Sequence, residues 1–156
     1  MTACCDGRSH GERLAERTRE GRTLSALIIN HRMGIDIYAK WDRMSMQDAA
    51  AQMSGVFSTE HGYVGYLREA YHGEPYATKV LVPEAFEDGR AHIDAGKLQK
   101  RLPDALHVAE TRERTVYGVT DDEDIERVLK SYRDFVALCT RKEEETGIPC
   151  LIVAAF

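Results

Sequence analysis

The chain has 156 residues, of which 43% are hydrophobic and 30% are charged, so its composition is that of a folded domain and excludes a wholly disordered chain. Its longest apolar run, from Cys150 to Phe156, is far shorter than the ~20 residues of a membrane helix, and no segment has the pattern of a signal peptide. The net charge is −5, and the 15 basic and 22 acidic residues of the segment 33–156 argue against binding to a nucleic-acid backbone. We therefore expect a cytoplasmic protein without a membrane or nucleic-acid partner.

The first 32 residues differ in character from the rest of the chain. They carry six Arg and no Lys, and residues 6–22 contain almost no large apolar side chain. Such a stretch cannot bury enough apolar surface to offset the entropy lost on ordering. We interpret residues 1–32 as a disordered extension, or as upstream sequence read from an early start codon. The alternative is a helix over residues 12–29. Residues 33–156 are then a single globular domain.

That domain begins with a clear strand pattern. Between residues 34 and 41, Ile35, Ile37 and Ala39 alternate with polar or charged side chains. A period of two is typical of a strand with one buried face. The following residues 46–53 are rich in Ala and Gln and favour a short helix.

Residues 54–77 have no clear period. Four glycines interrupt them and Pro75 ends any helix that precedes it, so we expect turns, short extended pieces and one helical turn at residues 67–71. Residues 79–82 are apolar apart from a lysine, and we interpret them as a second strand that stops at Pro83.

Residues 94–114 have the composition of helices. Asp94 is a candidate N-cap for a first helix that ends near Leu102. Pro103 fits the first turn of a helix, where its missing N–H costs little. The sequence therefore predicts a second helix from Pro103 to Arg114.

The longest predicted helix covers residues 121–146. Thr120 and Glu123 have the spacing of a capping box, and Gly147 is a typical C-terminal residue. One face carries apolar residues at helical spacing. These are Ile125, Val128, Leu129, Tyr132, Phe135, Val136 and Cys139.

The chain then ends in a continuous apolar run, which predicts a strand at the centre of a sheet and covered on both faces. The predicted fold class is α+β. We expect a small sheet with the C-terminal strand central, packed by the long amphipathic C-terminal helix and by shorter helices.

The densest group of reactive side chains lies in residues 61–76. Tyrosines, charged groups and glycines together are typical of a ligand pocket or of a protein interface. The candidate binding residues are Tyr66, Arg68, Glu69, Tyr71, His72 and Tyr76. The alternative is an irregular core segment, in which Arg68 pairs with an acidic residue of the sheet such as Asp36.

A second hypothesis is a metal-dependent enzyme. Glu69 and His72 are three residues apart, a spacing found in carboxylate-bridged metal sites, and His107 and Glu110 repeat it in reverse order. Such pairs also arise by chance. No nucleophile motif, phosphate-binding loop or Cys-x-x-Cys pair is present. We therefore expect no cofactor and name no catalytic residue.

Two short patches resemble small uncharacterised proteins of bacteria and their phages. They are Met33-Gly-Ile-Asp-Ile-Tyr and Gly65-Tyr-Leu-Arg-Glu-Ala-Tyr-His-Gly. The resemblance implies a small accessory protein, from a phage or another mobile element, and brings no activity with it. We expect a binding or regulatory protein that acts on an unknown protein or small ligand through residues 61–76. The oligomeric state is left open.

Overall fold

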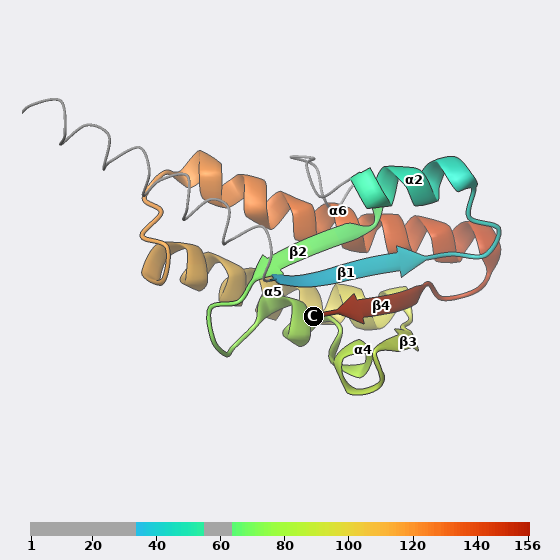
Figure 1. Cartoon of the computed structure of the whole chain (residues 1–156), viewed down its shortest axis with the longest axis horizontal. Coiled ribbons are helices and arrows are strands. Elements are labelled where there is room, and N and C mark those ends of the chain that lie inside the picture. The colour runs from blue at the N-terminus through green and yellow to red at the C-terminus, as the bar shows by residue number, and fades with distance from the viewer. Residues whose placement is uncertain (1–33, 55–63) are drawn as a thin grey trace, which may run out of the picture. The chain divides into compact units, whose positions relative to one another are not determined.

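The structure, a computed structural model, describes residues 34–54 and 64–156. They form five helices and a four-stranded antiparallel sheet, which confirms the predicted α+β class (Figure 1). In chain order the elements are β1 (Gly34–Lys40), α2 (Met46–Ser54), β2 (Tyr66–Ala70), α3 (Ala77–Leu81), α4 (Pro83–Asp88), β3 (Arg90–His92), α5 (Ala95–Thr115), α6 (Asp122–Thr146) and β4 (Leu151–Ala155). No helix in these ranges is both long enough and apolar enough to cross a bilayer. The expectation for residues 1–32 lies outside the described residues.

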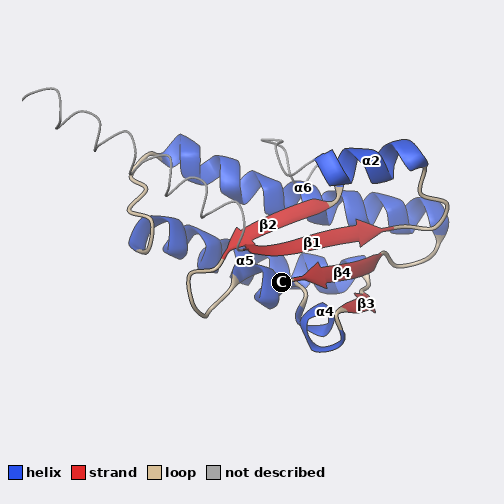
Figure 2. Ribbon diagram, viewed as in Figure 1, coloured by secondary structure: helices blue, strands red, loops and turns tan. Residues whose placement is uncertain are grey.

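The strands lie in the order β2-β1-β4-β3, and every neighbouring pair is antiparallel (Figure 2). The predicted central position of the C-terminal strand is therefore confirmed. Its predicted burial on both faces is only partly right, because Ile152 is fully buried while Leu151 and Val153 are half-buried. One face of the sheet is thus more deeply covered than the other.

Helices α5 and α6 cover that face and lie behind the sheet in Figure 1. The alternation in β1 places Ile35, Ile37 and Ala39 in the core, as predicted. The apolar stripe of α6 packs into the same core, with Tyr132 and Phe135 almost completely buried. Burial of these side chains provides the main driving force for holding α6 against the sheet.

Helix α6 begins one residue later than predicted. Its N-cap is Asp121, whose carboxylate accepts a hydrogen bond from the backbone N–H of Glu123 at 2.8 Å, so the predicted capping box at Thr120 is wrong. Asp121 satisfies one free N–H group of the first turn, which is the role predicted for Thr120. Gly147 ends the helix in the left-handed conformation, as the sequence indicated.

The prediction of a helical turn at residues 67–71 is wrong. Residues 66–70 form β2, in which Leu67 pairs with Ile37 of β1. Glu69 obscured the strand pattern, because a charged residue occupies a position that faces the core. Pairing with β1, which no local pattern reports, decides the conformation.

Two further segments also differ from the predictions. Residues 79–82 were expected to be a strand but lie mainly in α3, and Pro83 starts α4 at a first-turn position. Pro103 does not divide α5, which runs unbroken from Ala95 to Thr115. A proline inside a helix costs ~3 kcal/mol, and the packing of α5 against α3 and α6 compensates for this cost.

Gly65 lies where the backbone packs closely against the side chains of Gln52 and Leu138. Its φ is +76°, and a Cβ placed there would lie 2.9 Å from both Nε2 of Gln52 and Cδ2 of Leu138. Gly65→Ala should lower the free energy of unfolding by about 2–4 kcal/mol in chemical denaturation, through backbone strain and overpacking. Gly147→Ala, at φ +70° with no atom within 4 Å, isolates the backbone contribution and should cost about 1–2 kcal/mol. Equal losses would show that Gly65 is not tightly packed.

Candidate functional site

The strongest polar feature of the core is Glu69, which β2 directs toward the helices. Its carboxylate accepts hydrogen bonds from the backbone N–H groups of Ala77 at 3.0 Å and Thr78 at 2.8 Å, and from the Thr78 hydroxyl at 2.5 Å. Helix α3 has no cap from its own N-cap residue, Tyr76. Glu69 therefore satisfies the first turn of α3 from a neighbouring strand.

Arg112 of α5 completes this arrangement. One guanidinium nitrogen contacts a carboxylate oxygen of Glu69, and Nη2 lies 2.7 Å from a carboxylate oxygen of Glu113. The Glu69 side chain is fully buried and only 6% of the Arg112 side chain is exposed. The ion pair thus links β2, α3 and α5 inside the core, where a charge without a partner would be costly.

The same contacts set the charge of Glu69. Burial raises the pKa of the Glu69 carboxyl. The charge of Arg112 and the hydrogen bonds from Thr78 and His72 lower it by more than burial raises it, so the pKa lies below the ordinary value. Close by, burial and the charge of Glu69 raise the pKa of Tyr132. The network at neutral pH therefore consists of an ionised carboxylate, a guanidinium and a neutral phenol.

His72 extends the network toward the surface. Its Nε2 lies 3.0 Å from the Glu69 carboxylate, and its ring packs against Tyr76 with centroids 4.8 Å apart. A hydrogen bond to a carboxylate, which can only accept, requires a proton on Nε2 of His72. Nδ1 has no hydrogen-bond partner among the described residues, so it can accept a hydrogen bond from a ligand.

Beside His72 lies a pocket of about 320 Å³, called here the His72 pocket. Residues 72–75 form one wall and the last turns of α5 form the other. Its lining residues are His72, Gly73, Glu74, Pro75, His107, Val108, Thr111, Arg112, Thr115 and Val116. The volume lies at the lower end of the range for small-molecule sites.

The electrostatics of this pocket do not favour an anion. Among the described lining residues Arg112 is the one lysine or arginine, and Glu69 and Glu113 both contact its guanidinium. Two carboxylates and one guanidinium carry a net charge of −1, so a ligand with its own negative charge would be repelled. Hydrogen bonding through imidazole and hydroxyl groups is the interaction that the pocket offers to a ligand.

The structure distributes the six predicted binding residues over three places. Tyr66 and Arg68 lie on the face of the sheet opposite Glu69, where both donate hydrogen bonds to Asp36, at 2.6 and 2.9 Å. The Arg68–Asp36 pair is the one that the alternative interpretation named. His72 lines the His72 pocket and Glu69 lies behind that wall, in contact with His72 and Arg112, whereas Tyr71 and Tyr76 line a second pocket. His61 lies outside the described residues.

The four residues of the metal hypothesis do not form one centre. Glu69 and His72 are in contact, but the oxygens of Glu69 already accept hydrogen bonds from four residues. Glu110 instead pairs with an arginine of the next helical turn at 3.0 Å, and His107 lies on the pocket wall. In the described part of the chain, no group of three or more His, Cys, Asp or Glu residues has the arrangement of a metal site.

Sequence reasoning did not find Arg112, which lines the pocket and forms the buried ion pair with Glu69. A signal for it exists, because Ala105, Ala109 and Arg112 follow one another at helical spacing on the buried stripe of α5. A charged residue on such a stripe requires a buried partner of opposite charge. The identity of that partner, Glu69, follows only from the fold.

Comparisons of the chain with protein-family models, with curated proteins and with solved structures found no match. The described residues define an α+β protein with an antiparallel sheet, helices on one face and a pocket beside a buried ion pair.

Proposed function

We propose that this chain is a small-ligand-binding domain and that the His72 pocket is its binding site. One observation carries the proposal. One carboxylate oxygen of Glu69 forms two hydrogen bonds, one with Nε2 of His72 on one wall of the pocket and one with a guanidinium nitrogen of Arg112 on the other wall. Both walls are thus fixed by one buried group before any ligand arrives. Such preorganisation reduces the entropy cost of binding.

The chemistry of the walls indicates a neutral ligand that forms hydrogen bonds. Nδ1 of His72 can accept a hydrogen bond and the Thr111 hydroxyl can donate or accept one, while Val108 and Val116 provide apolar contact. The net negative charge around Arg112 disfavours carboxylates and phosphates. A small heterocycle with a donor and an acceptor on one edge fits these requirements.

Matched pairs of compounds test this proposal. Nicotinamide and uracil are neutral, whereas nicotinate and orotate add a carboxylate to nearly the same ring. We expect saturable binding of at least one neutral compound to the full chain by ligand-detected NMR. Its anionic counterpart should bind more weakly, by about 5-fold or more. Failure of both neutral compounds to bind, or tighter binding of the anions, would contradict the proposal.

A pocket-filling variant locates the site. Thr111 is exposed on the pocket wall, so Thr111→Trp should fill the pocket without unfolding the protein and should weaken binding by about 10-fold or more. Lys100→Trp places the same side chain on an exposed position of α5 outside the pocket and should leave the affinity unchanged. Equal affinities in the two variants would place the binding elsewhere.

A further inference from the structure

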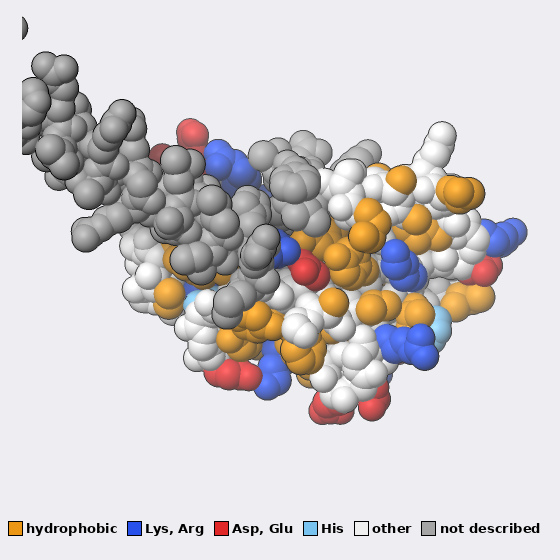
Figure 3. Space-filling view, viewed as in Figure 1, with side chains coloured by type: hydrophobic (Ala, Val, Ile, Leu, Met, Phe, Trp, Pro, Cys, Tyr) orange, Lys and Arg blue, Asp and Glu red, His pale blue; other side chains and the backbone are white. Residues whose placement is uncertain are grey.

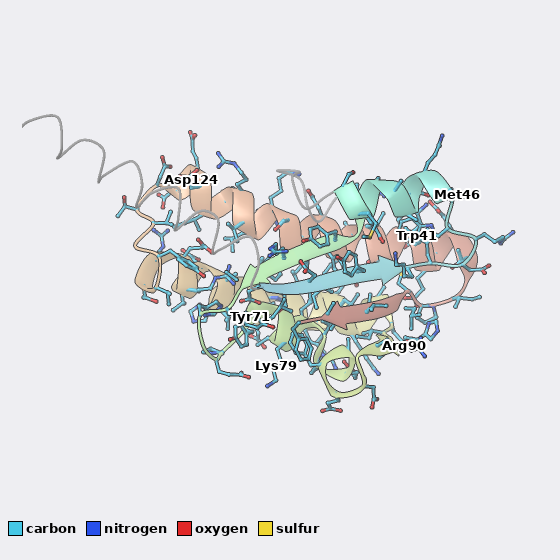
Figure 4. The ribbon with its side chains drawn as sticks, in the orientation of Figure 1. Trp41, Met46, Tyr71, Lys79, Arg90 and Asp124 are labelled. Atoms are coloured by element: carbon cyan, nitrogen blue, oxygen red, sulfur yellow. The ribbon has the colours of Figure 1, made fainter. Side chains whose placement is uncertain are left out.

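A second pocket, of about 400 Å³, lies on the other side of the segment 71–76 and shares only Glu74 with the His72 pocket. Four of its lining side chains are aromatic: Tyr71, Tyr76, Phe86 and Phe156. They come from the loop after β2, from α4 and from the C-terminal residue. Figure 4 labels Tyr71 and Lys79 at this end of the sheet, and Figure 3 shows hydrophobic side chains there beside acidic and basic ones.

The four rings form two pairs. Tyr71 and Tyr76 meet at 76° with centroids 6.4 Å apart, and Phe86 and Phe156 stack at 15° with centroids 5.4 Å apart. The face of an aromatic ring carries partial negative charge, so several rings around one hollow attract a cation. Tyr71 and Phe156 nevertheless stay 42% and 67% exposed, which leaves apolar surface that a ligand would cover.

The charged groups of the pocket add to this attraction. Lys79 is already paired with Glu74, with 2.6 Å between its ammonium nitrogen and the carboxylate. Glu87 has no hydrogen bond or ion pair within the described residues. The three charges sum to −1, so the carboxylate of Glu87 is available to a cation and repels an anion.

From these observations we infer that the second pocket, lined by Tyr71, Tyr76, Phe86, Phe156 and Glu87, binds an organic cation that carries a methylated ammonium group. Methyl groups remove the hydrogen bonds of the ammonium to water, so moving it between aromatic rings costs less than moving a lysine ammonium. The methyl groups also fill an apolar hollow that offers few hydrogen-bond donors. This site is separate from the His72 pocket and does not depend on the function proposed for it.

Choline and 3,3-dimethylbutan-1-ol test the inference, because they have the same shape and differ in charge. In titrations of the full chain followed by NMR, choline should bind saturably and about 5-fold or more tightly than the neutral alcohol. Absence of saturable binding by choline, or equal affinity for the alcohol, would overturn the inference.

Variants assign the binding to this pocket. Tyr71→Leu keeps an apolar side chain but removes the ring, and should weaken choline binding by about 5-fold, whereas Glu87→Gln should weaken it by about 2- to 3-fold. Tyr117→Leu is the matched control, because Tyr117 is a similarly exposed tyrosine, at 43%, that does not line this pocket. Unchanged affinity in Tyr71→Leu, or an equal loss in Tyr117→Leu, would contradict the assignment.

The methylated ammonium can belong to a free small molecule or to a methylated lysine of another protein. A short peptide with one trimethyllysine, titrated beside choline and the unmethylated peptide, distinguishes these sources. Where choline binds saturably, its tighter binding identifies a free ligand, and tighter binding of the methylated peptide than of choline identifies a protein ligand; either result supports the chemistry of the site. Equal binding of the methylated and unmethylated peptides, without choline binding, would overturn it.

Discussion

Replacement of Glu69 by Gln should lower the free energy of unfolding by about 3–5 kcal/mol, because it removes one partner of a buried ion pair. The amide cannot compensate for the charge of Arg112. In either orientation its NH2 group would face a donor that now bonds to a carboxylate oxygen, the N–H of Ala77 on one side or the N–H of Thr78 on the other. Urea denaturation measures this loss. Glu74→Gln, at an exposed residue three positions from the next helix, should change stability by no more than about 0.5 kcal/mol.

The pH dependence of the free energy of unfolding provides a second test of the role of Glu69. The pKa of Glu69 is lower in the folded protein than the ordinary value of 4.5 for a glutamate. Its stabilising contribution is therefore fully present above that value and is lost as the pH falls through the lower, folded pKa. We expect the difference in stability between the wild type and Glu69→Gln to shrink below about pH 4.5. A difference that stays constant to lower pH would mean that Glu69 is not the titrating group.

Phe135→Ala should also lower the free energy of unfolding by about 3–5 kcal/mol, because it removes a large ring from the core and leaves a cavity. Phe135 is fully buried at the contact between α6 and the sheet. Glu144→Ala on the exposed side of the same helix should cost no more than about 0.5 kcal/mol. Similar small losses in both variants, measured by chemical denaturation, would mean that α6 does not pack on the sheet through this stripe.

Leu129→Ala belongs to the same series and illustrates what the sequence pattern could not resolve. Leu129 shares the apolar stripe of α6, but the structure leaves it half-buried, whereas Phe135 is fully buried. The loss for Leu129→Ala should therefore fall near the low end of the usual range for core leucines, at about 2 kcal/mol. Helical periodicity identifies the face of a helix, and only packing determines how deeply each position lies.

Local patterns in the sequence were sufficient for four elements. The alternation in residues 34–41 predicted β1, the Ala-rich composition of residues 46–53 predicted α2, the stripe and Gly147 predicted α6, and the apolar run after Cys150 predicted β4. In each case the local signals agree with the environment that the fold provides. These elements were enough to predict the α+β class and the central position of β4.

Long-range contacts decided the elements that the sequence did not predict correctly. Residues 66–70 become a strand because β1 supplies hydrogen-bond partners, and α5 continues through Pro103 because it packs against α3 and α6. Neither effect has a signature within a short window of sequence. The local propensities of these segments are weak, so tertiary contacts outweigh them.

The candidate sites show the same division. The sequence by itself identified the segment that contains Glu69, His72 and Tyr71 as rich in binding chemistry. Only the tertiary structure showed that Glu69 is buried against Arg112, which lies 43 positions later in the chain, and that His72 and Tyr71 open into different pockets. The physical reason is that a residue's type limits which interactions it can form, whereas the fold determines which partners and how much water surround it.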